Sequence, residues 1–517
     1  MGFTDLNNGS STSTGGSLTS IAKPTVGFGG LEVQQLKPVA QGDFIYEISA
    51  TQVFSTASFV GSSITQVDGL AVLSSGTNVS GSAIIDLRRG VKYRPGQGSI
   101  MRATALFGTP QANSRQSIGL ANDECGYSFG YNGTSFGIFH IETGVLEIRK
   151  LEITTAATNG DTITITLDGD DYEFDIDIEG TTSTTQTAYK IAQQDFTQIG
   201  RTGFRVDVVG SDVYFMASRC NPTLTGSYSV SGGTIAGTFT RLATGADYTL
   251  TFISSSQFNI DKLDGTGESG MVINPQKGNV YEVDFQYLGF GNARFAVENP
   301  ETGRFIDCHM IKNANARTTP VLKNPNVKVR LECSNNGNTT PVELKSASMS
   351  GFIGGNVEKL DPKFSRSWTF SDLKSLTYTP LALVKVHRVF NNQPCFGEFD
   401  ILKIGASNET ASKTLSIGFF LESQITGDVV YENVRQENSI LSVADFNPGG
   451  VTPVNSISNL AGIQPFHEIL VGAESGLSHD LDPMEFIFSP GEPLLIAVKV
   501  TSGPVSGVVS LNWFEQQ

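Results

Sequence analysis

The sequence is short of cysteine, of basic residues and of long apolar runs, and each shortage excludes a class of protein. Its 517 residues contain five cysteines, an odd number without a closely spaced pair: Cys125, Cys220, Cys308, Cys333 and Cys395. They form neither a zinc-knuckle spacing nor a disulfide framework, so we expect reduced thiols. No apolar run approaches membrane-spanning length, which predicts no membrane insertion. The start, Met1–Leu6, shows neither a signal peptide nor a myristoylation motif, which favours assembly in the cytoplasm.

Basic residues are clearly outnumbered by acidic ones. Lysine and arginine total 35 against 51 aspartates and glutamates, so the net charge is −16 at pH 7. Half of this excess lies in residues 151–250, where 5 basic and 13 acidic residues give −8. Nucleic-acid binding needs a basic footprint that releases counterions from the phosphates. The sequence therefore predicts no direct nucleic-acid partner.

Turn-forming residues, by contrast, are abundant. Charged residues make up only 17% of the chain, while 56 glycines and 20 prolines separate short segments rich in Ser, Thr and Asn. This balance is typical of all-β proteins, and the length suggests about three domains. We predict two antiparallel β-sandwich, jelly-roll-like domains, the first interrupted by a small α+β insertion. The expected parts are a flexible arm over 1–24, a sandwich over 25–149 and 255–350, an inserted module over 150–254, a linker over 351–363 and a C-terminal sandwich over 364–517.

The inserted module is predicted from a change of periodicity. Two runs that alternate apolar and polar residues flank Asp168-Gly169, a strong hairpin signal. Ser183 and Gln186 then show the spacing of a helix cap, apolar residues follow at helical intervals, and alternation returns after them. The expected elements are strands over 162–167 and 172–178, a helix around 187–194, and strands over 204–209 and 213–217.

One strand of this module carries a row of acidic residues that invites comparison with a calcium site. Glu173, Asp175, Asp177 and Glu179 are spaced by two. On a strand this spacing directs all four carboxylates outward from one flat face, so they do not converge on an ion. We therefore expect a solvated face, and we predict neither a metal nor a cofactor.

Two short motifs match functional patterns by spacing alone. The G-x-S-x-G pattern of 133–137 places Ser135 in an expected hairpin, whereas a nucleophile elbow needs a following helix. The G-x-G-x-x-G pattern of 265–270 precedes a short strand expected over 271–275, whereas a dinucleotide site needs a helix. His479 falls in an expected polar loop. We predict that the chain is not an enzyme and has no catalytic, cofactor-binding or metal-ligating residues.

The end of the chain is expected to form closely packed strands. Residues 494–500 are nearly all apolar, and Val509, Leu511 and Trp513 would share one face of a later strand. We predict that Trp513 packs inside the C-terminal sandwich against 494–500.

Several runs of the sequence carry a family resemblance. They are Gly130–Gly137, Leu263–Met271, Asn274–Tyr281, Phe285–Gly291 and Val297–Pro300. Together they resemble virion structural proteins of tailed phages and other large double-stranded DNA viruses. The module, with Thr162–Gly169 and Thr187–Ala192, is similar to small domains inserted into phage tail, baseplate and head proteins. The end of the chain, with Pro490-Gly491 and Ser510–Glu515, is similar to the C-terminal sandwich modules of the same proteins. The resemblance covers about 130–311 and the last thirty residues.

This resemblance implies a viral structural protein of a tail, fibre, baseplate or capsid surface. Such a protein acts in particle assembly or host attachment through adhesion, as an oligomer, and fibre-like parts imply a trimer. The expected partners are copies of itself, other virion proteins and a host-surface glycan. The expected location is the virion, assembled in the host cytoplasm.

Two other classes stay open at this point. A glycan-binding, lectin-like adhesin has the same architecture and uses exposed aromatics; Tyr127, Tyr131 and Tyr287 are candidates, although strand aromatics more often lie in a core. A glycan-cleaving tailspike-type hydrolase needs two carboxylates facing each other roughly 5 to 10 Å apart, which a single sequence does not reveal.

Overall fold

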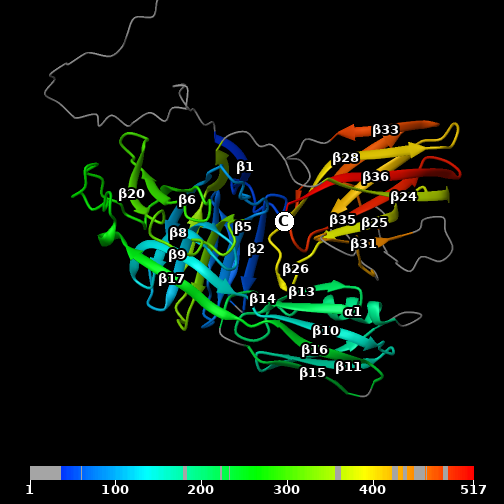
Figure 1. Ribbon diagram of the computed structural model, residues 1–517, viewed down its shortest axis with the longest axis horizontal. Coiled ribbons are helices and arrows are strands. Elements are labelled where there is room, and N and C mark those ends of the chain that lie inside the picture. Colours follow the sequence, from blue (N-terminus) through cyan, green and yellow to red (C-terminus); the bar gives the residue numbers. More distant parts are fainter. Residues whose placement is uncertain are drawn as a thin grey trace, which may run out of the picture.

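The structure, a computed structural model, contains three β-rich bodies (Figure 1). It describes residues 36–59, 61–177, 183–221, 224–231, 233–354, 363–421, 429–434, 439–446, 460, 463–480 and 487–516. Strands account for 57% of the described residues and helix for 3%, which confirms the predicted all-β sandwich class. The predicted flexible arm over 1–24 lies outside the described residues.

The first body is a sandwich of two antiparallel sheets. A nine-stranded sheet has the order β20-β19-β18-β6-β22-β4-β3, with β23 joining β6 to β1, and a seven-stranded sheet has the order β17-β9-β8-β7-β21-β5-β2. The strands of the first sheet are β1 (Leu36–Asp43), β3 (Ser63–Val67), β4 (Leu70–Ser74), β6 (Ser99–Phe107), β18 (Asn279–Phe285), β19 (Ala293–Glu298), β20 (Phe305–Ile311), β22 (Glu343–Ser346) and β23 (Ser348–Gly354). Those of the second are β2 (Val53–Ser58), β5 (Ser82–Leu87), β7 (Ser114–Ala121), β8 (Gly126–Asn132), β9 (Ser135–Val145), β17 (Ala246–Ser254) and β21 (Lys328–Asn335).

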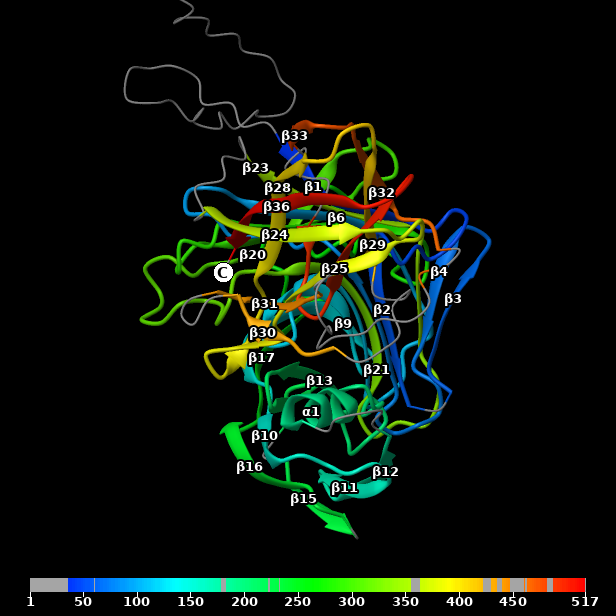
Figure 2. The same ribbon diagram turned by 90° about the vertical axis from the view of Figure 1, so that its right-hand side faces the viewer.

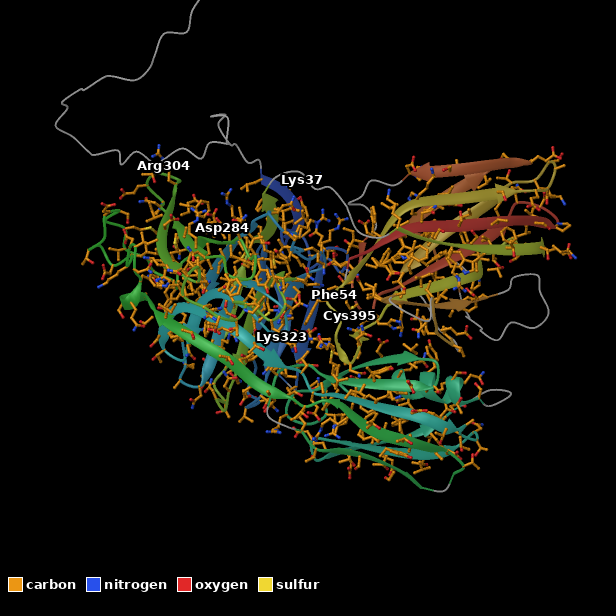
Figure 3. The ribbon with its side chains drawn as sticks, viewed as in Figure 1. Lys37, Phe54, Asp284, Arg304, Lys323 and Cys395 are labelled. Carbon is orange, nitrogen blue, oxygen red and sulfur yellow. The ribbon has the colours of Figure 1, made fainter. Side chains whose placement is uncertain are left out.

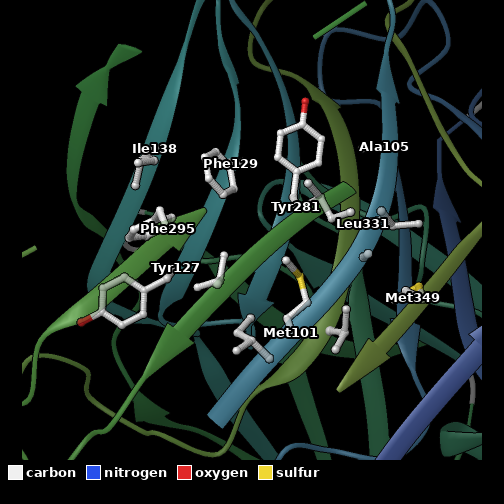
Figure 4. Close-up of a cluster of buried hydrophobic side chains, with 14 of the residues drawn as sticks. Met101, Ala105, Tyr127, Phe129, Ile138, Tyr281, Phe295, Leu331 and Met349 are labelled. Carbon is white, nitrogen blue, oxygen red and sulfur yellow. The ribbon is translucent and has the colours of Figure 1, made fainter. Parts of the chain in front are cut away.

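The core of this sandwich follows from alternation along its strands. Every second residue of β6, from Ser99 to Phe107, is buried. Aromatic rings from both sheets meet between them: the ring centroids of Phe129 and Phe295 lie 5.3 Å apart at 86°, an edge-to-face contact. Figure 4 shows these rings with Tyr281 beside them.

The second body is the inserted module. It has a four-stranded sheet, β13-β14-β10-β16, a three-stranded sheet, β12-β11-β15, and one α-helix. Its elements are β10 (Ile148–Thr155), β11 (Asp161–Leu167), β12 (Asp170–Ile176), α1 (Thr184–Ala192), β13 (Phe204–Val209), β14 (Asp212–Ala217), β15 (Gly226–Ser231) and β16 (Ala236–Ala243).

The turn and the helix cap that local sequence signals predicted for the module are present in the structure. Asp168 and Gly169 form the hairpin turn, with φ of 56° and 87°, and a positive φ is what this pair tolerates best. Ser183 caps α1, since its hydroxyl accepts a hydrogen bond from the Gln186 N–H at 3.1 Å. The helix begins three residues earlier than 187 and ends at Ala192.

Two of the predicted boundaries differ from the observed strand pairing. Strand β17, predicted as part of the module, pairs with β9 in the first sandwich, where Ile253 lies opposite Ile138. Its partner lies more than a hundred residues earlier, so no local pattern reveals the pairing. Strand β23 reaches Gly354 and pairs with β1 and β6, so the start of the predicted linker over 351–363 belongs to the first sandwich. Residues 355–362 lie outside the described part.

The third body is the C-terminal sandwich. Its five-stranded sheet has the order β24-β36-β28-β33, with β34 beside β28, and its six-stranded sheet has the order β30-β31-β25-β35-β29-β32. The strands are β24 (Lys363–Leu373), β25 (Thr379–Val386), β28 (Glu398–Asn408), β29 (Leu415–Leu421), β30 (Glu432–Asn433), β31 (Leu441–Asp445), β32 (His467–Val471), β33 (Ser475–Asp480), β34 (Ile487–Phe488), β35 (Pro493–Val500) and β36 (Val505–Gln516). A two-stranded hairpin, β26 (Val389–Phe390) and β27 (Gln393–Pro394), and a 3-10 turn, Ser255–Gln257, complete the described elements.

The module covers the outer face of the six-stranded sheet. Along β35, Leu494, Ile496 and Val498 belong to the core of the C-terminal sandwich. Leu495 and Ala497, on the opposite face, belong to a buried cluster that also contains module residues. Figure 2 shows α1 and β13 on the side of the module that faces this sheet. The run over 494–500 is apolar at nearly every position because both of its faces are buried.

Candidate functional site

Three ion pairs connect the three bodies in a triangle. Asp123 of the first sandwich lies 2.5 Å from Arg205 of the module. Asp207 of the module lies 2.6 Å from Lys385 of the C-terminal sandwich. Glu398 of the C-terminal sandwich returns to the first: it lies 3.5 Å from Lys92 and accepts the N–H of Gly90 at 2.8 Å. We refer to the pairs Asp123–Arg205, Asp207–Lys385 and Glu398–Lys92 as the ion-pair triangle.

The first ion pair of the triangle, Asp123–Arg205, belongs to a small buried network. The Asp123 carboxylate accepts hydrogen bonds from Arg205 and, at 2.7 Å, from Arg330, whose other N–H groups reach both oxygens of Asp86 at 2.7 Å. Asp123 is only 6% exposed. Burial by itself would raise the pKa of Asp123, but the charges of the two arginines outweigh it and hold the pKa well below its usual range.

The second ion pair of the triangle, Asp207–Lys385, joins the module to the C-terminal sandwich. One oxygen of Asp207 accepts from Lys385, and the other accepts the N–H of Arg388 at 2.7 Å. The ammonium of Lys385 also lies 4.1 Å from the ring centroid of Tyr431, a cation–π contact. Burial works to raise the pKa of Asp207, yet Lys385 and His387 beside it keep that pKa below its usual value.

Replacing Asp207 with alanine should loosen the module from the C-terminal sandwich. The change leaves the charge of Lys385 buried without its partner, a loss that costs about 3 to 5 kcal/mol when a buried pair is broken. We expect hydrogen exchange to accelerate at least about tenfold over 183–217 and 383–388, because about 1.4 kcal/mol corresponds to a factor of ten.

The control for this prediction is Asp212→Ala, which removes a partly exposed carboxylate paired with Lys150 inside the module. It should leave exchange over the same segments nearly unchanged. Equal protection in the Asp207 variant and the wild type would show that this pair does not hold the two bodies together.

A cavity of ≈ 290 Å³ opens where the three bodies meet. Figure 3 labels Phe54 and Cys395 in this region, between the bodies. Its lining comes from all three: Phe54 and Lys328 from the first sandwich, Arg205 from the module, and Cys395 and Ser489 from the C-terminal sandwich. This arrangement brings charged groups from distant parts of the sequence to one cavity.

The nucleophile-like motif lies elsewhere, in the hairpin that the sequence predicted. Ser135 opens β9, is exposed, and pairs with Asn132 across the β8–β9 turn. The loop predicted around His479 is wrong, because His479 lies on strand β33 opposite Ile404. Its side chain is exposed, and its ring stacks on that of His467 with the centroids 6.1 Å apart. The two candidate positions therefore belong to different domains.

The glycine motif over 265–270 forms a loop, as predicted. Asp261 organises it, because its carboxylate accepts hydrogen bonds from the N–H groups of Leu263 at 2.8 Å and Ser269 at 3.0 Å. The strand predicted over 271–275 is wrong, since a single bridge from Asp264 to Val272 is all that forms there. With its carboxylate used by the loop itself, the segment is a structural turn.

The acidic face of the module pairs with hydroxyl groups. Three threonines of β11 donate hydrogen bonds across to carboxylates of β12: Thr162 to Asp175, Thr164 to Glu173 and Thr166 to Asp171. Among the described residues, no group of three or more His, Cys, Asp or Glu side chains is placed to hold a metal ion. Within the same part of the chain, no helix is long and apolar enough to cross a membrane.

The aromatics considered for a lectin groove lie inside the protein. Tyr127 is fully buried and Tyr131 is 8% exposed, both in the core of the first sandwich. Tyr287 is half-buried, and its hydroxyl donates to the carbonyl oxygen of Leu322 at 3.1 Å. These three rings therefore form no exposed platform for a sugar.

Sequence reasoning missed the ion-pair triangle entirely. Its members are spread from Lys92 to Glu398, so spacing along the chain carries no sign of them. One weak signal existed: Lys385 interrupts a mainly apolar strand, and Arg205 and Asp207 are the charged positions of the otherwise apolar β13. A charge buried in such a strand needs a partner. The sequence could have indicated that partners exist, but not which residues they are.

Comparisons with known proteins give no family. No protein-family model matches the chain, and no curated protein matches it. Among solved structures, one from work on endo-acting O-glycanases of the human gut microbiota is 10% identical and covers 61% of this chain and 98% of its own, with a TM-score of 0.28. Peanut lectin is 9% identical, covers 63% and 100%, and has a TM-score of 0.23. The Faustovirus major capsid protein is 7% identical, covers 93% and 91%, and has a TM-score of 0.09. TM-scores this low carry no argument about function.

Proposed function

We propose that this chain is a structural component of a virus particle that acts in assembly or host attachment without catalysis. The observation that carries the proposal is the ion-pair triangle. Each pair of bodies is joined by at least one charged contact that is largely buried, with Asp207 and Glu398 4% and 2% exposed. Breaking such a contact leaves an uncompensated buried charge, so the three bodies are fixed in one orientation.

A fixed relative orientation of the three bodies suits a protein with a structural role. A particle component must present its surfaces to several neighbours at constant geometry, and rigid β-sheets pack into such parts without large rearrangement. The packing of the module on the C-terminal sandwich supports the same proposal, since the module and the six-stranded sheet share one buried apolar cluster. The net charge of −16 argues against contact with packaged nucleic acid, so the proposed partners are copies of the chain and other virion proteins.

The test is to locate the chain in particles. Antibodies raised against the purified protein should label particles from cells that produce it, and the free protein should sediment as a multiple of 55.2 kDa, with a trimer as the expected state. A protein that stays monomeric and is absent from every particle fraction would refute the proposal. Binding of the purified protein on a glycan array would assign it to host attachment.

Substitution of the two candidate catalytic side chains should change nothing measurable. Ser135→Ala and His479→Ala each remove an exposed group, so we expect melting temperatures within about 1 °C of the wild type, since such changes stay within about 0.5 kcal/mol. We also expect no turnover of polysaccharide or ester substrates by any of the three proteins. A hydrolytic activity that either substitution abolishes would overturn the non-catalytic assignment.

A further inference from the structure

The cavity between the three bodies has a charge opposite to that of the whole chain. Five cationic side chains line it, against two carboxylates, in a protein of net charge −16. Glu398 pairs with Lys92 from just outside the lining, which brings the balance to five against three. The cations are Lys92, Arg205, Lys328, Arg330 and Arg388, and the lining carboxylates are Asp86 and Asp123.

The two lining carboxylates are already neutralised. Arg330 contacts both oxygens of Asp86 and one of Asp123, whose other oxygen accepts from Arg205. These four side chains form two cations and two anions in mutual contact. The excess positive charge of the cavity therefore comes from its other cationic side chains. Among these, Lys328 has the most fully defined contacts.

Lys328 is held in place by neutral groups. Its ammonium donates to the carbonyl oxygen of Arg88 at 3.1 Å and to the hydroxyl of Ser489 at 3.2 Å, and it lies 4.6 Å from the ring centroid of Phe54. Among the residues that the structure describes, no carboxylate comes within ion-pair distance of this ammonium. Its contacts therefore fix the ammonium at the cavity wall without an ion-pair partner, although the charges of Glu398 and Asp86 act on it from a greater distance. A half-buried cation in this state gains energy from an anion placed beside it.

We propose that this interdomain cavity binds a small oxyanion, the carboxylate or phosphate group of a small molecule, with Lys328 as its principal charge partner. The volume of ≈ 290 Å³ is near the lower end of ligand pockets, which suits a single sugar acid or a phosphate rather than a polymer. Apolar lining from Phe54 and Met216 leaves room for a non-ionic part of the molecule. Thr56 in the lining is exposed, so the cavity reaches the surface there.

The affinity of this site for an anion should also depend on pH. Burial lowers the pKa of Lys328 to about 8, so the ammonium is charged at pH 7 and loses its proton as the pH rises through 8. Glucuronate keeps a single ionised carboxylate over this range. Its affinity should therefore fall about tenfold between pH 7 and pH 9, in step with the charged fraction of Lys328.

The experiment is calorimetric titration of the full-length protein with glucuronate, with inorganic phosphate and with glucose as the neutral counterpart. One glucuronate or phosphate should bind per chain, and whichever binds identifies the source of the oxyanion. Lys328→Met, which keeps most of the stem beside Phe54, should weaken that binding at least about tenfold, because each lost tenfold corresponds to about 1.4 kcal/mol. Lys328→Arg should retain most of it, and Lys374→Met, at a side chain 67% exposed, should leave it unchanged.

Three results would overturn the proposal. They are the absence of binding by both anions, equal binding of glucose, and equal affinity in the Lys328→Met and wild-type proteins. If Lys328→Met does not fold, the wild-type affinity for glucuronate at pH 7 and pH 9 decides: no weakening at pH 9 would remove Lys328 from the site.

Discussion

Asp123→Ala should be among the most destabilising single substitutions in this protein. It leaves two arginine side chains, Arg205 and Arg330, without the buried carboxylate that they share. Removing one partner of a buried ion pair costs about 3 to 5 kcal/mol, and this pair also joins the module to the first sandwich. The free energy of unfolding, measured by urea titration, should fall by about that amount.

The matched control is Asp480→Ala. Asp480 also pairs with a basic residue, Lys403, but its side chain is 80% exposed. An exposed pair is worth at most about 1 kcal/mol, so the urea midpoint should barely move. Similar losses in the Asp123 and Asp480 variants would mean that the buried network adds no more stability than a surface pair.

The same carboxylate should make stability depend on acid. The pKa of Asp123 lies below its usual range in the folded protein, against about 3.9 when unfolded. Its contribution is therefore complete above about pH 4 and is lost as the pH falls below that value toward the folded pKa. Asp123→Asn lacks this group, so the gap between wild type and variant should be wide at pH 5 and should narrow by pH 3.

Trp513→Ala should produce the largest loss within the C-terminal sandwich. Trp513 is 3% exposed on β36, a strand that pairs with neighbours on both sides. Its ring lies 6.1 Å from that of Phe364 and 5.9 Å from that of Phe399. Its indole N–H donates to the buried Glu515 at 3.0 Å. Removing it should create a cavity costing about 3 to 5 kcal/mol, and a calorimetric melt should shift down by roughly 10 °C for a unit of this size.

Two comparison variants separate packing from other effects. Trp513→Phe keeps an aromatic ring and should lose less, while Leu470→Ala, at a side chain 64% exposed on the edge strand β32, should leave the melt unchanged. An unchanged melt for Trp513→Ala, combined with lost attachment to cells or particles, would show that the indole acts at the surface.

Local signals predicted local elements well. Asp168-Gly169 gave a hairpin turn and Ser183 a helix cap, because each depends on the backbone preferences of a few neighbouring residues. Trp513 was correctly expected inside the terminal sandwich, since alternation along one strand is enough to divide its two faces.

Local sequence patterns did not predict which strands pair when they lie far apart in the sequence. The strand β17 looked like part of the module because it follows the module's strands directly, but it pairs with β9 across the insertion. Backbone hydrogen bonds between strands depend on register and position in space, and many alternative partners have similar sequence patterns. The same limit applies to the cavity, whose lining comes from three separate bodies.

The sequence by itself determined that the protein is all-β, that a module with one helix interrupts the first sandwich, and that Ser135 lies in a hairpin. These properties follow from periodicity, turn residues and composition, which act over a few residues. Only the tertiary structure decided that the module covers the outer face of the six-stranded sheet, that Asp123, Asp207 and Glu398 join the three bodies, and that Lys328 lines a cavity between them. The physical reason is that buried charges and apolar faces specify only that a partner must exist, while the identity of the partner depends on how separately formed domains pack.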